Sequence, residues 1–172
     1  EFKSKSSFTI MPIIVDNGFQ GPQSSLNNLS DFCSIARIPG FTITNKIDAE
    51  KIISSELVKP GFRIICPSQR LFQEEIIEPG KLEYVNKENT VFQYSAGTDV
   101  TIVCFKLSFS YGFELSSRLS KKKKFASLFT INSPICNDWS KIIDNLKITK
   151  KLIVFEDSKS INTIDSSFIN DV

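Results

Sequence analysis

The chain has 172 residues, of which 41% are hydrophobic and 23% are charged, proportions typical of a folded protein with one domain or two small ones. Its 21 Lys and Arg residues exceed the 19 Asp and Glu residues by two, a net charge too small to predict binding to nucleic acid or to a membrane by charge alone. The chain contains no histidine, which excludes histidine general bases, Ser-His-Asp triads and histidine-ligated zinc sites formed within it.

The four cysteines stand at wide intervals with no CxxC pair, which argues against a zinc site or thioredoxin-like chemistry. Because apolar residues precede Cys66, Cys104 and Cys136, we interpret the thiols, Cys33 included, as buried and reduced rather than as disulfides. No apolar run approaches the roughly 20 residues of a membrane-spanning helix. The polar first residues do not resemble a signal peptide, so we expect a cytoplasmic or organelle-matrix location.

Strand-like and helix-like patterns alternate along the first part of the chain. The predicted elements are a strand at 8–15, a helix at 26–36, a strand at 41–43, a helix at 47–57 and a strand at 62–66. Pro12 favours the start or the edge of a sheet for the first strand. Asn45, with Asp48 three residues later, is spaced to cap the second helix.

Residues 67–98 show no clear periodicity and carry prolines and mixed charges, so we expect an irregular linker there. The alternation then resumes with a strand at 100–105, a helix at 111–119, a strand at 125–131, a helix at 138–146 and a strand at 152–155. Lys121 to Lys124 suit a solvated helix end better than a ligand site. The pattern predicts an α/β protein: two small three-layer α/β units with mainly parallel sheets, joined by the linker.

Ligands of parallel α/β sheets bind outside the carboxyl ends of the strands, which here are the loops after Val15, Cys66, Phe105 and Phe155. The loop at 16–27 is the richest of these. Its glycines permit close approach to the backbone, and a serine before the next helix can present helix amides to an anion. An ordinary turn followed by a helix cap explains the same residues.

Several of these segments together resemble the thiamine-diphosphate-dependent transketolase family, which includes the beta subunits of 2-oxo-acid dehydrogenases. The first half carries Gly21-Pro22-Gln23-Ser24-Ser25, then Ala36-Arg37-Ile38-Pro39-Gly40-Phe41-Thr42-Ile43, then Asp48-Ala49-Glu50. The second half carries Gly97-Thr98-Asp99-Val100-Thr101-Ile102-Val103 and Leu152-Ile153-Val154-Phe155-Glu156-Asp157. Each motif is weak, but together they occur in the family's order and spacing over most of the chain.

The resemblance implies a division of the chain and a function. Residues 1–66 would be the end of a pyrimidine-binding domain, 67–98 an interdomain linker, and 99–172 an incomplete transketolase C-terminal domain. The chain would be a part or a subunit of an enzyme of ketol transfer or 2-oxo acid decarboxylation, contributing to the substrate channel and the dimer interface. The alternative is a catalytically degenerate member that acts as an interaction or regulatory subunit. An α/β binding module related by fold alone is a third reading.

The implied site residues fall in three loops. Gly21, Pro22, Gln23, Ser24 and Ser25 would lie beside the cofactor or the substrate channel; Ser68, Gln69 and Arg70 would contact substrate; Glu156 and Asp157 would form a late strand-end loop. No catalytic residue is assigned, and no metal ligand is expected within the chain.

The chain also departs from the family pattern. Ser24 stands where the beta subunits have histidine, and Lys106 stands where the family has a strand-end glycine. The family's activating glutamate lies upstream of the matched part, and its diphosphate and metal site lies in a different domain or subunit. Thiamine diphosphate and Mg²⁺ are therefore expected only in a complete assembly, and the isolated chain is expected to be inactive.

The resemblance also predicts association, because the family places its active sites between subunits. The expected partner is a second copy or another thiamine-enzyme subunit, with the loop at 21–27 facing the partner or a cleft. With 15 Phe in 172 residues, some aromatic surface is expected at an interface. In the competing interpretation every Phe fills the two cores and the protein is a monomer. Nucleic acid and membrane are not expected as partners.

Overall fold

The computed structural model describes residues 6–14, 28–72, 77–136, 138–157 and 164–172. The strands are β1 (Ser7–Ile10), β2 (Gly40–Ile43), β3 (Gly61–Pro67), β4 (Tyr84–Val85), β5 (Val91–Ser95), β6 (Val100–Phe105), β7 (Ala126–Ile131) and β8 (Leu152–Phe155). The helices are α1 (Leu29–Ala36), α2 (Lys46–Glu56), α3 (Phe109–Lys121), α4 (Ser140–Thr149) and α5 (Ile164–Asp171). Short 3₁₀ turns lie at Gln69–Phe72 and Lys106–Ser108.

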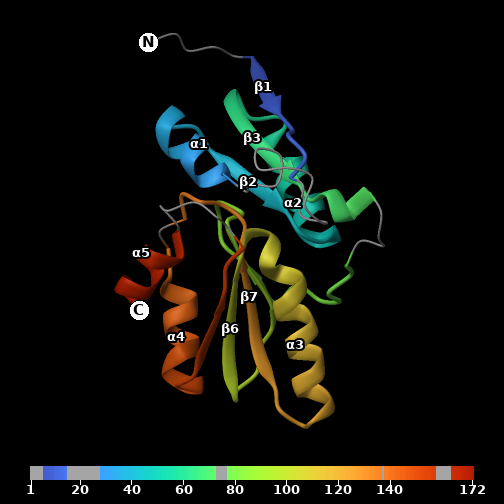
Figure 1. Cartoon of the computed structure of the whole chain (residues 1–172), viewed down its shortest axis with the longest axis vertical. Helices are drawn as coiled ribbons and strands as arrows, with labels where there is room; N and C mark the ends of the chain where they lie inside the picture. Colours follow the sequence, from blue (N-terminus) through green and yellow to red (C-terminus); the bar gives the residue numbers. More distant parts are fainter. Residues whose placement is uncertain (1–5, 15–27, 73–76, 137, 158–163) are drawn as a thin grey trace.

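The first unit is a three-stranded parallel sheet in the order β1-β3-β2. Figure 1 shows it at the top of the molecule, with α1 and α2. Leu29 and Cys33 of α1 pack with Ile64 of β3, whereas Ile52 of α2 packs with Ile65, the next residue of that strand. Because successive strand residues point to opposite faces, the two helices cover opposite faces of the sheet. This is the predicted three-layer α/β arrangement.

The second unit is a five-stranded mixed sheet in the order β4-β5-β7-β6-β8. Strands β6, β7 and β8 run parallel, as predicted, with α3 on one side and α4 on the other (Figure 1). The prediction of an irregular linker over 67–98 is wrong for 84–95, because these residues form a β4–β5 hairpin. Strand β5 of this hairpin also pairs antiparallel with β7, so β5 is an internal strand of the sheet.

One buried hydrophobic cluster spans the two units. Phe41 and Ile65 of the first sheet belong to the same buried cluster as Phe92, Tyr94 and Phe109 of the second unit. A second cluster lies between the five-stranded sheet and helices α4 and α5, where Trp139 and Phe168 make edge contacts with Phe105. Because burial of apolar area is the main stabilising contribution, the shared cluster joins the two units.

Glycines of the resembling motifs are required by close packing. A Cβ atom on Gly40 would lie 2.3 Å from Cys33 Sγ, and one on Gly97 would lie 2.1 Å from the Phe125 carbonyl oxygen. Both distances are too short for any side chain. Gly40 therefore lets α1 approach β2, and Gly97 lets the chain enter β6 beside β7.

Local sequence signals explain several element boundaries. The Asn45 side chain accepts from the Ile47 and Asp48 amides, and Asp48 accepts from the Asn45 amide, so the predicted helix cap is confirmed. Strand β1 ends at Ile10, before Pro12, and lies at the sheet edge that Pro12 favoured. All four cysteines are free and buried, as predicted. Helix α5 was not predicted.

Candidate functional site

The carboxyl ends of strands from both sheets meet near the boundary between the units. Leu107, which follows β6, packs into the buried cluster that contains Ile14, Leu29 and Cys66 of the first unit. Ile14 forms an isolated parallel bridge with Ser68, just after β3. Ser108 Oγ donates to the carbonyl oxygens of Phe105 (2.8 Å) and Phe155 (2.9 Å), which ties the ends of β6 and β8 together. We call this region the strand-end site; its residues are Ser68, Gln69, Lys106, Ser108, Glu156 and Asp157.

Lys106 is the most unusual residue of the strand-end site. Its backbone has a φ of 55°, in the left-handed region that favours glycine, and its side chain is fully buried. Lys106 Nζ lies 2.8 Å from Glu156 Oε1. Glu156 Oε1 also accepts from the Asp157 amide at 3.0 Å. A buried cation is expensive unless a counter-charge accompanies it, so Lys106 and Glu156 act as one unit.

Buried polar atoms at this edge, that of Lys106 included, lack hydrogen-bond partners among the described residues. They are Gln69 Oε1, Ser30 Oγ near the start of α1, and Lys106 Nζ, whose ion pair does not have hydrogen-bond geometry. Buried polar groups are normally satisfied, so this edge has unused capacity for water or for a polar group from elsewhere.

The predicted site residues have different outcomes. Gly21 to Ser25 lie outside the described residues, as does the side chain of Arg70. Ser68 is buried after β3, and Gln69 begins the 3₁₀ turn that follows it. Glu156 and Asp157 lie at the end of β8, where Glu156 pairs with Lys106. The sequence identified Lys106 as a departure from glycine, but it contained no signal for the burial of its side chain or for its partner.

A second polar cluster, the interunit clasp, was missed by sequence reasoning. It consists of Thr42, Asn45, Asp48, Tyr94 and Asn132. The side-chain amide nitrogen of Asn132 donates to the Thr42 carbonyl (3.0 Å) and to Asp48 Oδ2 (2.6 Å). The backbone carbonyl of Asn132 accepts from the Thr42 amide (2.7 Å). Asn45 Nδ2 donates to the Tyr94 hydroxyl at 2.7 Å. These bonds cap the β2 edge of the first sheet and fix its position against the second unit.

Asp48 is the ionisable centre of the interunit clasp. It is fully buried and accepts hydrogen bonds from the side chains of Thr44 (2.5 Å) and Asn132. Burial raises the pKa of Asp48 to about 6, although these hydrogen bonds act to lower it. Burial also raises the pKa of Tyr94.

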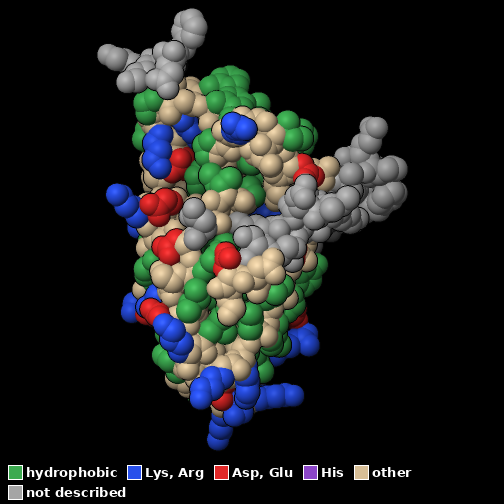
Figure 2. Space-filling view, turned by 90° about the vertical axis from the view of Figure 1, so that its left-hand side faces the viewer, with side chains coloured by type: hydrophobic (Ala, Val, Ile, Leu, Met, Phe, Trp, Pro, Cys, Tyr) green, Lys and Arg blue, Asp and Glu red, His purple; other side chains and the backbone are tan. Residues whose placement is uncertain are grey.

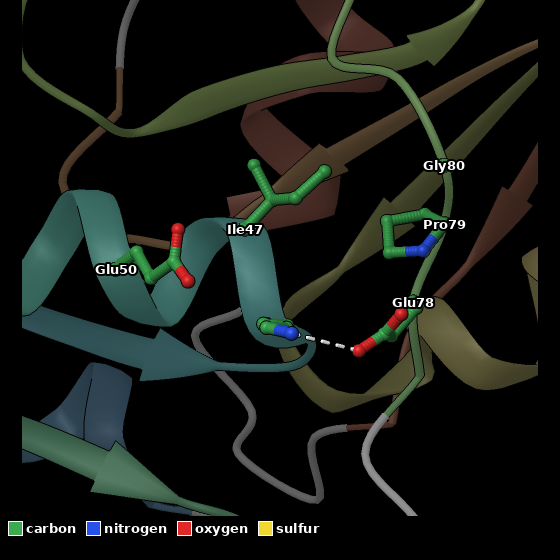
Figure 3. Close-up of a pocket in the computed structure, with 6 residues that line it drawn as sticks. Ile47, Glu50, Glu78, Pro79 and Gly80 are labelled. Atoms are coloured by element: carbon green, nitrogen blue, oxygen red, sulfur yellow. Dashed lines mark hydrogen bonds and ion pairs between the residues drawn. The ribbon is translucent and has the colours of Figure 1, made fainter.

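A cavity of about 310 Å³ at the start of α2 is an unconvincing active site (Figure 3). Two of its lining residues, Lys46 and Glu78, form an ion pair at 2.9 Å, and both side chains are more than half exposed. The Lys46 amide donates to the Ile77 carbonyl, and the Asn45 side chain occupies the next amides. The helix end therefore has no spare donors for an anion.

Within the described ranges, no three His, Cys, Asp or Glu side chains are grouped so as to hold a metal ion. The helices of the described part include none that is long and apolar enough to cross a bilayer.

Comparison with known proteins yields a fold likeness and no family assignment. No protein-family model and no curated protein matches the sequence. Among solved structures, a split-gene transketolase, described as an inactive β4 tetramer, matches 94% of this chain and 52% of its own, with a TM-score of 0.71 and 14% identity. A transketolase of Campylobacter jejuni matches 93% of this chain and 29% of its own (TM-score 0.59, 11% identity). A mutant transketolase of Pichia stipitis matches 94% and 27% (0.58, 11%).

The chain therefore has a transketolase-like α/β fold, as the motifs predicted. It spans about half the length of the split-gene structure and less than a third of the other two.

Proposed function

We propose that this chain is a part or a subunit of a thiamine-diphosphate-dependent transketolase-like enzyme, of ketol transfer or 2-oxo acid decarboxylation. In this proposal it contributes to the substrate channel and the subunit interface and does not catalyse alone. The fold likeness supports the proposal, as does the coverage of only half of the split-gene subunit. The expected partner is a second copy or another thiamine-enzyme subunit.

The observation that carries the proposal is the open edge of the first sheet. The β2 edge is capped by Asn132, but no described residue pairs with the outer edge of β1. On the α1 face, Phe8 and Phe62 stack with ring centroids 5.3 Å apart and remain 60% and 36% exposed. Figure 2 shows hydrophobic side chains on the surface of this unit. An apolar open edge is normally covered, which favours an associating protein.

The described strand ends do not fit thiamine diphosphate by themselves. Glu156, one of the two carboxylates that the sequence placed there, is paired with the buried Lys106. Besides Asp157, the other polar groups are the Gln69 amide and the hydroxyls of Ser68 and Ser108. A diphosphate with Mg²⁺ needs oxygen ligands that complete an octahedral shell. The cofactor is therefore expected in an assembly in which another domain or subunit supplies those ligands.

Lys106 favours the alternative function, a catalytically degenerate interaction or regulatory subunit. The position keeps the left-handed backbone that suits glycine, yet it carries a long cationic side chain that pairs with Glu156. This side chain fills space at a strand end where the family places a glycine. A chain in which the Lys106 side chain fills this space can still form the subunit interface.

Calorimetric titration with thiamine diphosphate and Mg²⁺ tests the proposal and separates the two functions. The isolated chain is expected to give no binding, so micromolar affinity, about −8 kcal/mol, contradicts the proposal. The titration is repeated on the chain with its co-purifying partner. Cofactor binding by the complex supports the catalytic subunit, whereas a stable complex without cofactor binding supports the degenerate one.

A further inference from the structure

The end of the second unit opposite the strand-end site is strongly basic. It contains the last turns of α3 and α4 and the loops that lead into β7 and β8, at the bottom of Figure 1. Figure 2 shows Lys and Arg side chains gathered at this end. We call it the basic end; its members are Arg118, Lys121, Lys122, Lys123, Lys124, Lys147, Lys150 and Lys151.

Contacts around the start of β6 show that the lysines after α3 and the lysines after α4 are neighbours in space. Phe125 donates its amide to Asp99 Oδ2 (2.9 Å), and Thr101 donates its amide to the Lys151 carbonyl (2.8 Å). The hydrogen bond from the Phe125 amide lowers the pKa of Asp99, and Lys124 and, to a smaller extent, Lys151 lower it further. The fold therefore brings together cations that are about 27 positions apart in the sequence, which the linear charge pattern did not show.

The charge of the basic end exceeds that of the whole chain. Three carboxylates accompany its eight cations: Glu114 pairs with Arg118, Asp99 with Lys124, and Asp144 with Lys147. The other five lysines have no ion-pair partner among the described residues. The basic end therefore carries +5, and the remaining 13 cations and 16 carboxylates carry −3. A charged surface that approaches the basic end responds to the charge of this end and not to the net charge of the chain, because the Debye length is only about 8 Å at physiological ionic strength.

Large apolar side chains are exposed among these lysines. Phe125 follows Lys124 and is 57% exposed, Leu152 follows Lys151 and is 36% exposed, and Ile148 of α4 is 62% exposed. The lysines in the last helical turns have an ordinary role, since cations there stabilise the helix dipole. That role does not explain why aromatic and aliphatic side chains stand exposed beside them.

We propose that the basic end attaches the protein peripherally to an anionic lipid surface. Clusters of four to eight Lys or Arg are attracted to anionic headgroups, and exposed apolar side chains at the same place insert at the boundary with the acyl chains. The composition favours lipid over nucleic acid, because nucleic-acid recognition favours the planar, bidentate guanidinium of arginine. Seven of the eight cations are lysines, and the one arginine is engaged with Glu114. In this orientation the strand-end site faces away from the membrane.

This proposal does not depend on the proposed function. The expectation of no membrane partner rested on the net charge of the chain and on the lack of an apolar run long enough to span a bilayer. The uneven distribution of charge removes the first of these grounds. Peripheral attachment also needs no membrane-spanning helix.

Vesicle co-sedimentation at physiological ionic strength tests the proposal. The chain is expected to bind vesicles of phosphatidylcholine with phosphatidylserine and not vesicles of phosphatidylcholine alone. The triple variant K121Q/K122Q/K123Q should lower the partition coefficient on the order of 100-fold, at about fivefold per lysine. F125S should lower it about tenfold without changing any charge. The matched control K51Q/K81Q/K87Q removes three exposed lysines elsewhere and should bind like the wild type.

Several results would overturn the proposal. One is equal binding to both kinds of vesicle, and another is an equal loss in the triple variant and its control. A third is unchanged binding by F125S. A fourth is preferential binding of a single-stranded oligonucleotide that displaces the vesicles. All the substitutions are at exposed positions, and unchanged thermal unfolding of each variant shows that the fold is intact.

Discussion

The buried carboxyl group of Asp48 should make the stability of the protein depend on pH in an unusual direction. Asp48 accepts hydrogen bonds from Thr44, Asn45 and Asn132, all neutral donors, and no described cation pairs with it. Burial raises its pKa from 3.8 to about 6. The folded protein therefore holds this proton more tightly than the unfolded chain does.

The sign and size of the effect follow from proton linkage. A group whose pKa is raised on folding adds stability when it is protonated, below its unfolded pKa, and this contribution is lost as the pH rises through the folded pKa. A difference of about two pKa units corresponds to about 3 kcal/mol in the free energy of unfolding. The contribution of Asp48 should thus fall between about pH 4 and pH 6 and stay constant above that window.

Urea unfolding of the wild type and of D48N across this pH window measures the effect. Other carboxylates contribute slopes of their own, so the relevant quantity is the difference between the two proteins. D48N should lack the decrease that Asp48 causes. The control D144N removes an exposed carboxylate whose pKa is lowered by Lys147, and it should retain the decrease. Identical pH profiles for D48N and the wild type would refute the assignment.

Three further substitutions test other parts of the structure. N132A removes both hydrogen bonds that the Asn132 side-chain amide donates across the interunit clasp, and it should lower the free energy of unfolding by about 3 kcal/mol. The control N145A loses one hydrogen bond within the second unit and should lower the free energy of unfolding by about 1 kcal/mol. Equal losses would show that the clasp has no special weight. K106G should destabilise the protein by about 3 kcal/mol in urea unfolding, because Glu156 loses its buried counter-charge, and the double variant K106G/E156Q should recover most of this. No recovery would mean that the ion pair is not the cause. F8S/F62S should weaken association in light scattering while the helix content stays unchanged, and full association would place the interface elsewhere.

The alternation of strands and helices could be predicted because it depends on local periodicity. Leu152–Phe155 was predicted with its observed bounds, and Asn45 and Asp48 marked the start of α2. The hairpin at 84–95 was missed because its place in the sheet depends on pairing with β7, in which Gln93 lies opposite Phe129. The run Val91-Phe92-Gln93-Tyr94, rich in β-branched and aromatic residues, was a usable signal.

The candidate site was predictable in position and not in detail. The carboxyl ends of parallel strands indicated where Ser68 and Glu156 would lie, because topology fixes that edge. The pairing of Lys106 with Glu156 joins residues 50 positions apart, and the bond between Asp48 and Asn132 joins residues 84 positions apart. Such contacts form only when distant parts of the chain pack together, and local sequence patterns do not predict them.

The central claim is that this chain works by association, and light scattering at micromolar concentration tests it most directly. The account predicts a stable species larger than the 19.4 kDa monomer, formed by a second copy or by a co-purifying chain. A single species of 19.4 kDa with no co-purifying chain would contradict it.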